Sequence, residues 1–389
     1  MNPGKTILAQ LLEPLHPEEF RRCALRHPTT RATTSLSAYD HFATLIFAQL
    51  TFRESLRDIE ACLGSCPDML YHSGIRSRIT RTNLAYANEH RSAKLFAEVA
   101  MLLMRRAQKL YADAPDKLSL DGDLFAIDST LIDLSLALFP WARWQGTQAA
   151  VKLNVLLGVA SELPSFCTLV DGGEHDVNFL DNLIFIAGCY YTLDRGYLDF
   201  ARLYRITQSR AWFVTRLKSN ILYYVVESRP VNNQEGVRCD QSIRVTGRKP
   251  KRGYPDVLRR IHYYDKESGN DLELLTNNFI LPALVIALIY KRRWEIELFF
   301  RWMKQHLKVR GFYSTSRNGV EVQIWTALCA FLLVAIVHRE QALPGSLHRT
   351  LQIISVRPFE KVPLYQLVAK NTTRNMMIDI PIQLEINGF

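Results

Sequence analysis

The sequence predicts an α/β fold in which an all-helical N-terminal region precedes a core of strands and helices, and a β-rich segment interrupts that core. Three observations lead to this prediction. Helical periodicity dominates residues 1–111, and β-branched apolar runs followed by helical segments fill residues 118–217. Short strand patterns separated by Gly, Pro and Asn then occupy residues 218–278. A pair of helices over residues 279–340 completes the core, and we assign no role to residues 341–389.

The length and charge of the chain narrow its class. Its 389 residues suffice for two or three domains, and 48% hydrophobic with 22% charged residues is an ordinary globular composition. The net charge of +10 favours a polyanionic partner such as DNA, although charge alone is a weak indicator. Two apolar runs, Phe279–Tyr290 and Ile324–Val337, are shorter than the roughly 18 residues that indicate a membrane span. We therefore expect a soluble cytoplasmic protein, associated with the nucleoid through DNA and not with a membrane.

The N-terminal region is predicted to consist of helices joined by short turns. Thr80 is placed to cap the N-terminus of the helix that follows it. Arg76, Arg78 and Arg81 surround this helix start, so a helix–turn–helix that reads DNA is one interpretation, and an ordinary helical bundle is an equally good one. The predicted helices are Ala9–Arg22, Tyr39–Leu63 and Ser92–Tyr111, and the best candidate linker is 112–117.

Two acidic residues of the core stand where apolar runs end. Leu124–Ile127 is a short strand pattern that ends at Asp128, and Ile184–Leu193 leads into Asp194. Because ligands bind at the strand ends of α/β sheets, both acids are candidate site residues, and the alternative is a turn or capping role. Further strands are predicted at Val151–Ala160, Ser165–Val170 and Ala211–Arg216.

Three further polar residues of the core each have two interpretations. Lys152, in the strand after the first acid, could reach a phosphate or could extend along the strand to solvent. His175 and Asp176 could lie near the acidic site, or could be a surface His and a helix-capping Asp. The sequence leaves both interpretations open.

The stretch Tyr290–Arg310 contains no Pro or Gly and is predicted to form one long helix. At about 100° per residue, its polar residues fall on one narrow stripe opposite an apolar side. This stripe holds one carboxylate among cationic and phenolic groups, whereas a solvated face, the alternative interpretation, would mix the signs more evenly. A lone Glu among cations suits a metal ligand surrounded by groups that hold phosphate. The stripe consists of Tyr290, Arg293, Glu297, Arg301, Lys304 and Lys308.

A second cluster of cations lies within the β-rich segment. Residues 248–252 place four cations within five positions, and we expect them to form a loop that contacts the DNA backbone. The cations are Arg248, Lys249, Lys251 and Arg252, with Pro250 between them.

The three acids Asp128, Asp194 and Glu297 could converge in the fold, although they are far apart in sequence. Carboxylate oxygens are the ligands that Mg²⁺ prefers, and Mn²⁺ should substitute for it. Two such ions at one site activate the attacking oxygen and stabilise the leaving oxygen in a phosphodiester displacement. The three acids together therefore predict a two-metal site for phosphodiester chemistry.

The polar stripe of the predicted helix carries a family resemblance. Tyr290-xx-Arg293-xxx-Glu297-xxxxxx-Lys304 matches, without a gap, the Y-(2)-R-(3)-E-(6)-K signature of the IS4 family of bacterial transposases. This four-residue signature is specific when two acids lie upstream of it, whereas a single block would be weak.

Three upstream blocks resemble the same family. Asp128-Ser129-Thr130 is similar to its first catalytic block, and 193–197, LDRGY, is similar to its second. The run from Ala48 to Glu60 resembles the helical domain that precedes the catalytic core in one branch of the family. The resemblance covers roughly residues 10 to 340.

The resemblance implies an RNase H-like catalytic core interrupted by a β insertion. It implies that Asp128, Asp194 and Glu297 form a DDE triad that binds divalent metal, while Tyr290, Arg293 and Lys304 handle the DNA near the cleaved end. Cut-and-paste movement through a DNA hairpin is usual in the family. Double-stranded DNA, as terminal repeats and target, would be the partner of a homodimer. On the helical stripe, we expect Arg293 to act on DNA separately from the metal chemistry of Glu297.

Two rival functions fit part of these observations. A stand-alone nuclease of the same fold would cut DNA without joining it, and an inactive remnant of a mobile element would only bind DNA. The presence of all three acids argues against the remnant.

Overall fold

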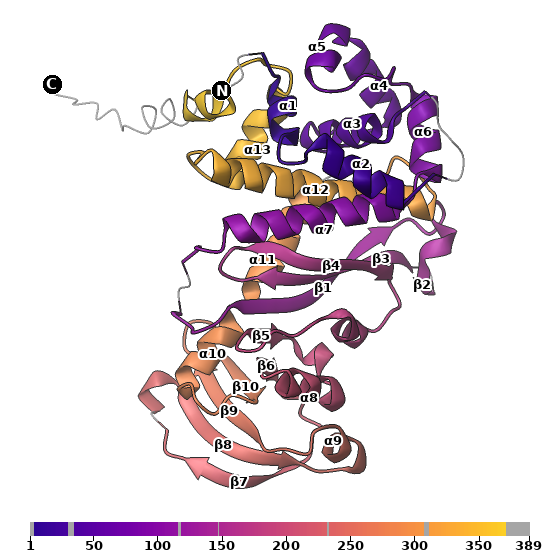
Figure 1. Cartoon of the computed structure of the whole chain (residues 1–389). Helices are drawn as coiled ribbons and strands as arrows, with labels where there is room; N and C mark the ends of the chain where they lie inside the picture. The colour runs from indigo at the N-terminus through magenta and orange to yellow at the C-terminus, as the bar shows by residue number, and fades with distance from the viewer. Residues whose placement is uncertain are drawn as a thin grey trace, which may run out of the picture. The chain divides into compact units, whose positions relative to one another are not determined.

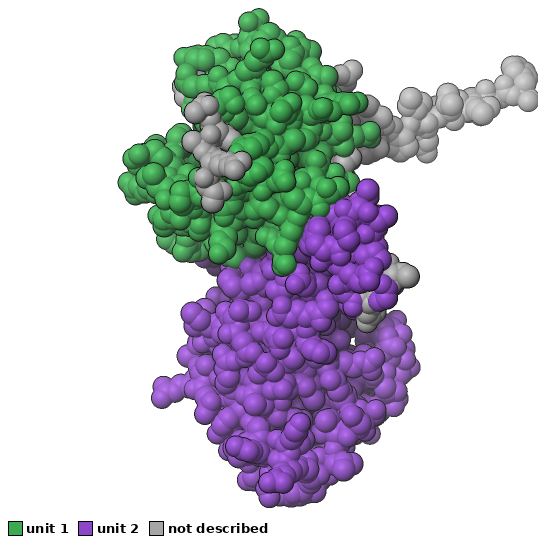
Figure 2. Space-filling model, turned by 90° about the vertical axis from the view of Figure 1, so that its right-hand side faces the viewer, with its two compact units in different colours: residues 1–111, 303–389 green, residues 112–302 purple. Residues whose placement is uncertain are grey.

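A computed structural model of the chain describes residues 4–29, 35–115, 118–146, 148–231, 233–306 and 311–370. The chain folds into two compact units, which Figure 2 colours separately. Unit 1 comprises residues 1–111 and 303–389, and unit 2 comprises residues 112–302. The predicted linker 112–117 thus begins where the first part of unit 1 ends. The predicted mixed α/β class is confirmed, with helices at the N-terminus and a large central sheet (Figure 1).

Unit 1 is a helical unit built around one apolar helix. Its N-terminal helices are α1 (Ile7–Leu12), α2 (Pro17–Arg26), α3 (Ala38–Leu50), α4 (Leu56–Gly64), α5 (Pro67–His72), α6 (Arg81–His90) and α7 (Ala93–Leu110), and its C-terminal ones are α12 (Arg317–Glu340) and α13 (Leu347–Val356). Helix α12 packs against α7 and α3. In the described part of the chain, α12 alone is long and apolar enough to cross a membrane. However, 94% of its most apolar 18-residue stretch is buried inside the protein, as in a core helix.

The helix predicted over 39–63 is interrupted. Helix α3 ends at Leu50 and α4 begins at Leu56, with Phe52 in a left-handed conformation (φ 55°) between them. Ser55 then caps α4 by accepting a hydrogen bond from the backbone N–H of Asp58. The predicted cap at Thr80 is confirmed, since its side chain accepts from the N–H of Asn83.

Unit 2 is organised on one sheet, which has ten strands among the described residues. The strand order is β2-β3-β1-β5-β6-β10-β9-β8-β7, with β4 paired to β3. The strands are β1 (Leu124–Leu134), β2 (Arg143–Gln145), β3 (Gln148–Gly158), β4 (Leu163–Asp171), β5 (Tyr190–Leu193), β6 (Trp212–Arg216), β7 (Tyr223–Arg229), β8 (Val237–Val245), β9 (Leu258–Asp265) and β10 (Asn270–Thr276). Strands β1, β3 and β4 form an antiparallel meander, and β5 and β6 run parallel to β1.

Helical segments connect these strands and continue into unit 1. They include the short 3-10 helices η1 (Pro140–Ala142), η2 (Asp176–Asn182), η3 (Arg195–Tyr197) and η4 (Asn233–Glu235). The α-helices are α8 (Phe200–Gln208), α9 (Arg248–Gly253), α10 (Ala283–Lys291) and α11 (Trp294–His306). Segments η2, η3 and α8 cover one face of the sheet, where Phe179, Tyr197 and Leu203 join Ile127 and Leu193 in a buried apolar cluster.

The parallel pairing of β1 with β5 depends on glycines at the start of both strands. A Cβ atom at Gly122 would lie 2.2 Å from the carbonyl oxygen of Gly188, which itself has a positive φ of 81°. Any larger side chain at position 122 would therefore push the two strand starts apart. This close approach sets the two strands that precede Asp128 and Asp194 side by side.

The structure corrects the expected position of Asp128. Strand β1 does not end there: it pairs with β3 from Phe125 as far as Leu134, and Asp128 lies opposite Val155 inside the ladder. The polar residues Ser129 and Thr130 after it are accommodated within the strand, because alternate side chains of a strand point to opposite faces. For Asp194 the prediction is right, since β5 ends at Leu193.

Residues 218–278 contribute four strands to the same sheet as the core. Strand β10 pairs with β6, so that β9, β8 and β7 extend the sheet outward from the core strands. The expected basic loop at 248–252 is wrong in form, because these residues make the short helix α9. Helix α9 begins after Gly247 (φ 87°), which places Pro250 in the first turn, where the missing N–H costs nothing.

The single helix predicted from Tyr290 is wrong. The chain forms α10, a tight turn at Arg292–Arg293, and α11, and the predicted residues 307–310 lie outside the described part. At the turn, the N–H of Arg293 bonds the carbonyl of Tyr290 at 3.0 Å, and that of Ile296 bonds Arg293 at 3.2 Å. These three-residue bonds break the four-residue pattern without Pro or Gly.

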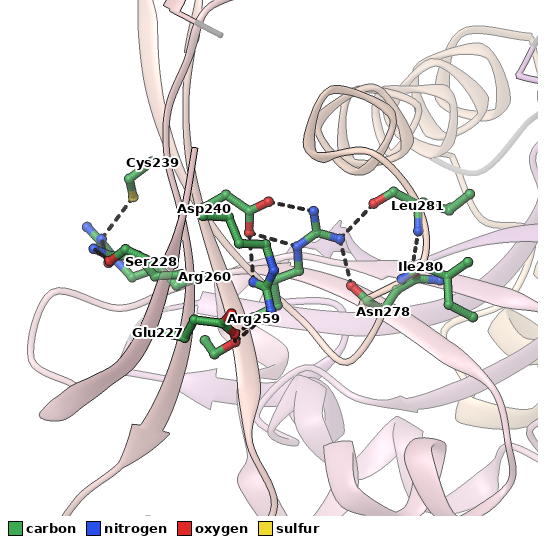
Figure 3. Close-up of polar contacts among 12 residues, drawn as sticks. Glu227, Ser228, Cys239, Asp240, Arg259, Arg260, Asn278, Ile280 and Leu281 are labelled. Carbon is green, nitrogen blue, oxygen red and sulfur yellow. Dashed lines mark hydrogen bonds and ion pairs between the residues drawn. The ribbon is translucent and has the colours of Figure 1, made fainter. Parts of the chain in front are cut away.

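A buried ion pair joins the sheet extension to the start of α10 (Figure 3). The guanidinium of Arg259, on β9, donates to both carboxylate oxygens of Asp240 on β8 at 2.8 and 2.7 Å. Its third nitrogen donates to the backbone carbonyls of Asn278 and Leu281, just before α10. The Arg259 side chain is only 5% exposed, and a planar guanidinium is suited to serving several acceptors at once.

We predict that Arg259→Met destabilises the protein strongly. The substitution leaves two backbone carbonyls unpaired and deprives a buried carboxylate of its bidentate partner, a change that typically costs about 3–5 kcal/mol. The matched control is Arg238→Met, which breaks an exposed pair with Asp271 in the same part of the sheet and should cost about 1 kcal/mol or less. Urea unfolding of both variants measures the difference, and equal costs would contradict the anchoring role.

Candidate active site

Strand pairing brings Asp128 and Asp194 together. In the parallel ladder of β1 and β5, Ile127 lies opposite Leu193. An acid follows each of these two residues, so Asp128 and Asp194 are neighbours on adjacent strands of the sheet. Ile127 and Leu193 point to the face of the sheet that carries the apolar cluster. Because successive side chains along a strand alternate between the two faces, the acids that follow them point to the other face.

Arg293 links Asp128 to Glu297. Its guanidinium donates to Asp128 Oδ2 at 3.1 Å and to Glu297 Oε1 at 2.5 Å. The turn at Arg292–Arg293 starts α11, which carries Glu297 one helical turn further along. The arginine side chain is only 16% exposed, so this pairing is better shielded than a surface ion pair.

Burial and charge shift the pKa values of this group. Burial raises the pKa of Asp128 from 3.8 to about 6, and the charges of Asp194 and Glu297 add to that increase. The N–H of Ser129 and the charge of Arg293 oppose it. Burial also raises the pKa of Tyr290, beside Asp194, Arg293 and Arg216.

The chemistry of the acids suits a hard divalent cation. Three carboxylates supply only oxygen ligands, and Asp128 holds a partly buried negative charge that a cation would stabilise. Among the described residues, no three His, Cys, Asp or Glu side chains lie close enough to hold one ion in this conformation. Arg293 stands between Asp128 and Glu297, so its guanidinium supplies the positive charge there.

Comparison with known proteins identifies the family. The protein family described as "Transposase DDE domain" matches residues 119–333, which is more than half of the chain. The chain belongs to the DDE-domain transposases. A separate description, Domain of unknown function (DUF4372), matches residues 3–76 in unit 1.

Several relatives are named as transposases. The y4zB protein of Sinorhizobium fredii is 34% identical over 260 residues, covering 66% of this chain and 71% of its own length. The protein named for insertion sequence element IS5377 of Geobacillus stearothermophilus is 32% identical, over 54% of this chain and 55% of its own. That named for IS4SA of Synechocystis is 23% identical, over 68% and 77%. A solved piggyBac transposase complex with hairpin DNA is 11% identical, with a TM-score of 0.45, over 97% of this chain and 82% of its own.

In this transposase, Arg293 contacts two of the acids directly, a contact that the helical stripe did not predict. A helical wheel for one continuous helix places Arg293 on the same stripe as Glu297 but gives no reason for contact with strand β1. The turn between α10 and α11 redirects the arginine toward Asp128. Arg293 therefore balances the acids directly, whatever it does with DNA.

The other predicted cations that the structure describes belong to α11 and α9. Arg301 lies 5.9 Å from the ring centroid of Trp294 on its own helix. Lys304 belongs to the last turns of α11, which are part of unit 1, and Lys308 lies outside the described residues. Lys249 and Arg252 of α9 line a cleft at the N-terminus of α8, together with Asp199 and Lys218. Lys251 of the same helix lines a different cleft, beside Arg244 and Tyr254.

The structure resolves the two-way interpretations of Lys152, His175 and Asp176. His175 is exposed, which agrees with the interpretation of this residue as a surface histidine. Asp176 does not cap η2 with its side chain but accepts from Ser129 Oγ at 2.8 Å, next to the first acid. Lys152 is buried and donates to Asp176 Oδ1 at 2.7 Å, so it extends neither to solvent nor to a phosphate.

Sequence reasoning missed two residues of this region. Tyr197 is buried near Asp128 and Asp194, and Arg216 lies near Tyr290. A signal existed for both. Tyr197 is part of the LDRGY block, and Arg216 ends β6, which pairs in parallel with β5 so that Arg216 follows the partner of Leu193.

We predict that Asp128 titrates near pH 6 in the metal-free protein, and that Arg293→Met raises this pKa further. The arginine charge lowers the pKa, so its removal disfavours the carboxylate. Because the folded-state pKa exceeds the ordinary 3.8, this group stabilises the fold fully below pH about 4, and that stabilisation is lost as the pH rises through about 6. Carboxyl-detected NMR measures the pKa.

The control for this measurement is Lys291→Met, which removes a cation paired with Asp265 and Glu267. It should leave the Asp128 pKa unchanged. An Arg293→Met variant in which Asp128 titrates at or below the wild-type pH would contradict the contact.

Proposed function

We propose that this chain is an IS4-family DDE transposase that binds transposon ends, cleaves DNA by metal-assisted phosphodiester hydrolysis and joins the ends to target DNA. The observation that carries the proposal is the register that sets Asp128 beside Asp194, together with the pairing of Arg293 with both Asp128 and Glu297. Family membership and the relatives from insertion sequence elements support it.

The order of the strands supports an RNase H-like core. An antiparallel meander of β1, β3 and β4 is followed by β5 and β6, both parallel to β1, with α8 as the crossover between them. This is the arrangement expected of that fold. Strands β7–β10 then stand in the chain between this core and the helix that carries Glu297, which agrees with an inserted segment.

The three acids would hold two Mg²⁺ ions, or Mn²⁺ in their place. When bound, the ions would activate the attacking oxygen and stabilise the leaving oxygen of the phosphodiester. Asp128 must be ionised to act as a ligand, and its raised pKa means that metal binding competes with a proton near pH 6. Arg293 holds Asp128 and Glu297 close together, so their mutual repulsion is balanced before any ligand arrives.

Double-stranded DNA would bind along the cationic surfaces of both units. Tyr290, Arg293 and Lys304 would hold the end near the cleaved bond, with Arg301 and Lys308 beside them on the helix. A cleft of about 650 Å³ between the start of α8 and α9 adds Lys218, Lys249 and Arg252 in unit 2. Unit 1 would recognise the terminal repeats, and the enzyme would work in the cytoplasm, at the nucleoid, as a homodimer on two ends.

We predict that Glu297→Gln abolishes cleavage while end binding survives. The substitution keeps the shape and removes the charge that a divalent ion requires, so the loss should exceed the roughly 10–100-fold cost of an outer-shell change. Glu295→Gln is the matched control, because Glu295 lies on the same helix and pairs with Arg292 instead. Single-turnover cleavage, strand transfer and binding on one end substrate are measured for both.

Near wild-type cleavage by Glu297→Gln would remove the catalytic assignment from α11. Cleavage by the wild type without strand transfer would favour a stand-alone nuclease.

We predict that replacing all four cations of α9 with Gln weakens DNA binding without changing the cleavage rate at saturating DNA. Each lost phosphate contact should lower the slope of log K against log salt by about 0.9. The control replaces Arg205 and Arg238, exposed cations whose charges are paired with Asp181 and Asp271. If the α9 variant keeps the wild-type affinity and salt slope, this helix does not contact DNA.

A further inference from the structure

We propose that the ion pair of the buried Lys152 with Asp176, acting through Ser129, positions the carboxylate of Asp128 for metal binding. This inference rests on the proposed function, because it assigns a role relative to the same acids. The pair lies on the opposite face of β1 from Asp128 and makes no described contact with that carboxylate. Lys152 and Asp176 are therefore positioning residues and not catalytic ones.

The pair forms a chain of contacts that ends at Asp128. Lys152 Nζ donates to Asp176 Oδ1 at 2.7 Å, and Ser129 Oγ donates to the same oxygen at 2.8 Å. The backbone N–H of Ser129 donates to Asp128 Oδ1, also at 2.8 Å. Ser129 is thus held through its side chain by Asp176 and holds the carboxylate of Asp128 with its backbone.

The burial of Lys152 indicates that this side chain binds a residue of the protein and not the DNA substrate. The residue is only 8% exposed, in the middle of β3, and such a cation is stable only if it is paired and hydrogen-bonded. It donates to the carbonyl of Glu174 as well as to Asp176, so both ends of this short segment are bound to it. A buried lysine engaged in this way is not available to a DNA phosphate.

The segment that carries Asp176 is pressed against β3. The N–H of Gly172 donates to the carbonyl of Ala150 at 3.1 Å, and a Cβ atom at position 172 would lie 2.8 Å from that oxygen. Glycine at 172 therefore permits the close approach that brings Asp176 to Ser129. Backbone packing and the ion pair act on the same segment from two directions.

Tyr197 connects the second acid to this arrangement. Its backbone N–H donates to the carbonyl of Asp194 at 3.0 Å, within the turn that follows β5. Burial raises the pKa of its phenol, the charges of Asp128, Asp176 and Asp194 add to the increase, and the Ser129 hydroxyl opposes it. The phenol thus lies among the residues that hold both acids, and it stays protonated at neutral pH.

The experiment is a double-mutant cycle with Lys152→Met, Asp176→Asn and the combined variant, made in the full chain. We expect each single variant to raise the Mg²⁺ concentration for half-maximal single-turnover cleavage by about 10–100-fold, the usual cost of losing an outer-shell partner. The rate at saturating Mg²⁺ and DNA binding in EDTA should change little. The combined variant should be no worse than the worse single, because both substitutions remove one interaction.

The matched control is Asp181→Asn. Asp181 lies on the same segment η2, and its side chain is 47% exposed, against 41% for Asp176. Its carboxylate pairs with Arg202 and Arg205 of α8 instead of with β1 and β3. It should lower the unfolding temperature without shifting the Mg²⁺ dependence. Ser129→Ala should behave like the single variants, while Ser129→Thr, which keeps a hydroxyl, should restore the wild-type dependence.

Calorimetric Mn²⁺ binding is measured in parallel, so that the test does not depend on activity. Weaker Mn²⁺ binding in both single variants, with normal binding in Asp181→Asn, supports the proposal. Unfolding-temperature changes alone, or no Mn²⁺ binding by the wild type, overturn it. Loss of DNA affinity by Lys152→Met at unchanged metal dependence would also overturn it, since Lys152 would then be a phosphate contact. If the wild type binds Mn²⁺ but does not cleave end DNA, the proposed function fails, and the calorimetric comparison still decides the positioning role.

Discussion

The gathering of negative charge around a partly buried aspartate is the constraint on which this structure depends. Asp128 is surrounded by two further carboxylates, and burial, together with their charges, raises its pKa to about 6. Without compensation, the group would favour protonation or separation of the acids. Arg293 supplies the compensation by donating to both Asp128 and Glu297. A helix from the end of the core is thereby attached to a strand from its beginning.

The backbone arrangement that makes this contact possible is non-local. Asp128 and Asp194 become neighbours only through the parallel register of β1 and β5, which begins where Gly122 and Gly188 approach closely. Arg293 reaches Asp128 only because α10 and α11 meet at a turn, and α10 is itself held at its start by Arg259. Each contact constrains a different part of the chain. Arg293 bridges Asp128 and Glu297 because all of these parts are fixed together.

These dependences explain which features the sequence could predict. The strand before Asp194 and the cap at Thr80 depend on a few adjacent residues, and both predictions are confirmed. The continuation of β1 past Asp128 depends on its pairing with β3, and the contact of Arg293 is with Asp128, a residue equally distant in sequence. Helical periodicity carries no information about such partners. The four-residue spacing of Arg293 and Glu297 places the two side chains in contact on α11. The single helix predicted from Tyr290 does not form.

The alternation of side chains along β1 gives the site two supports of different kinds. Asp128 faces Arg293, which also pairs with Glu297, while Ser129 faces the opposite side and the pair of Lys152 with Asp176. A metal ion that binds Asp128 and Glu297 takes over the two carboxylates that neutralise Arg293. Lys152 keeps its own partner, Asp176, because that carboxylate is not one of the three acids. Under the proposed function, Arg293 is the exchangeable counter-charge, and Lys152 belongs to the permanent frame that keeps Asp128 in place during that exchange.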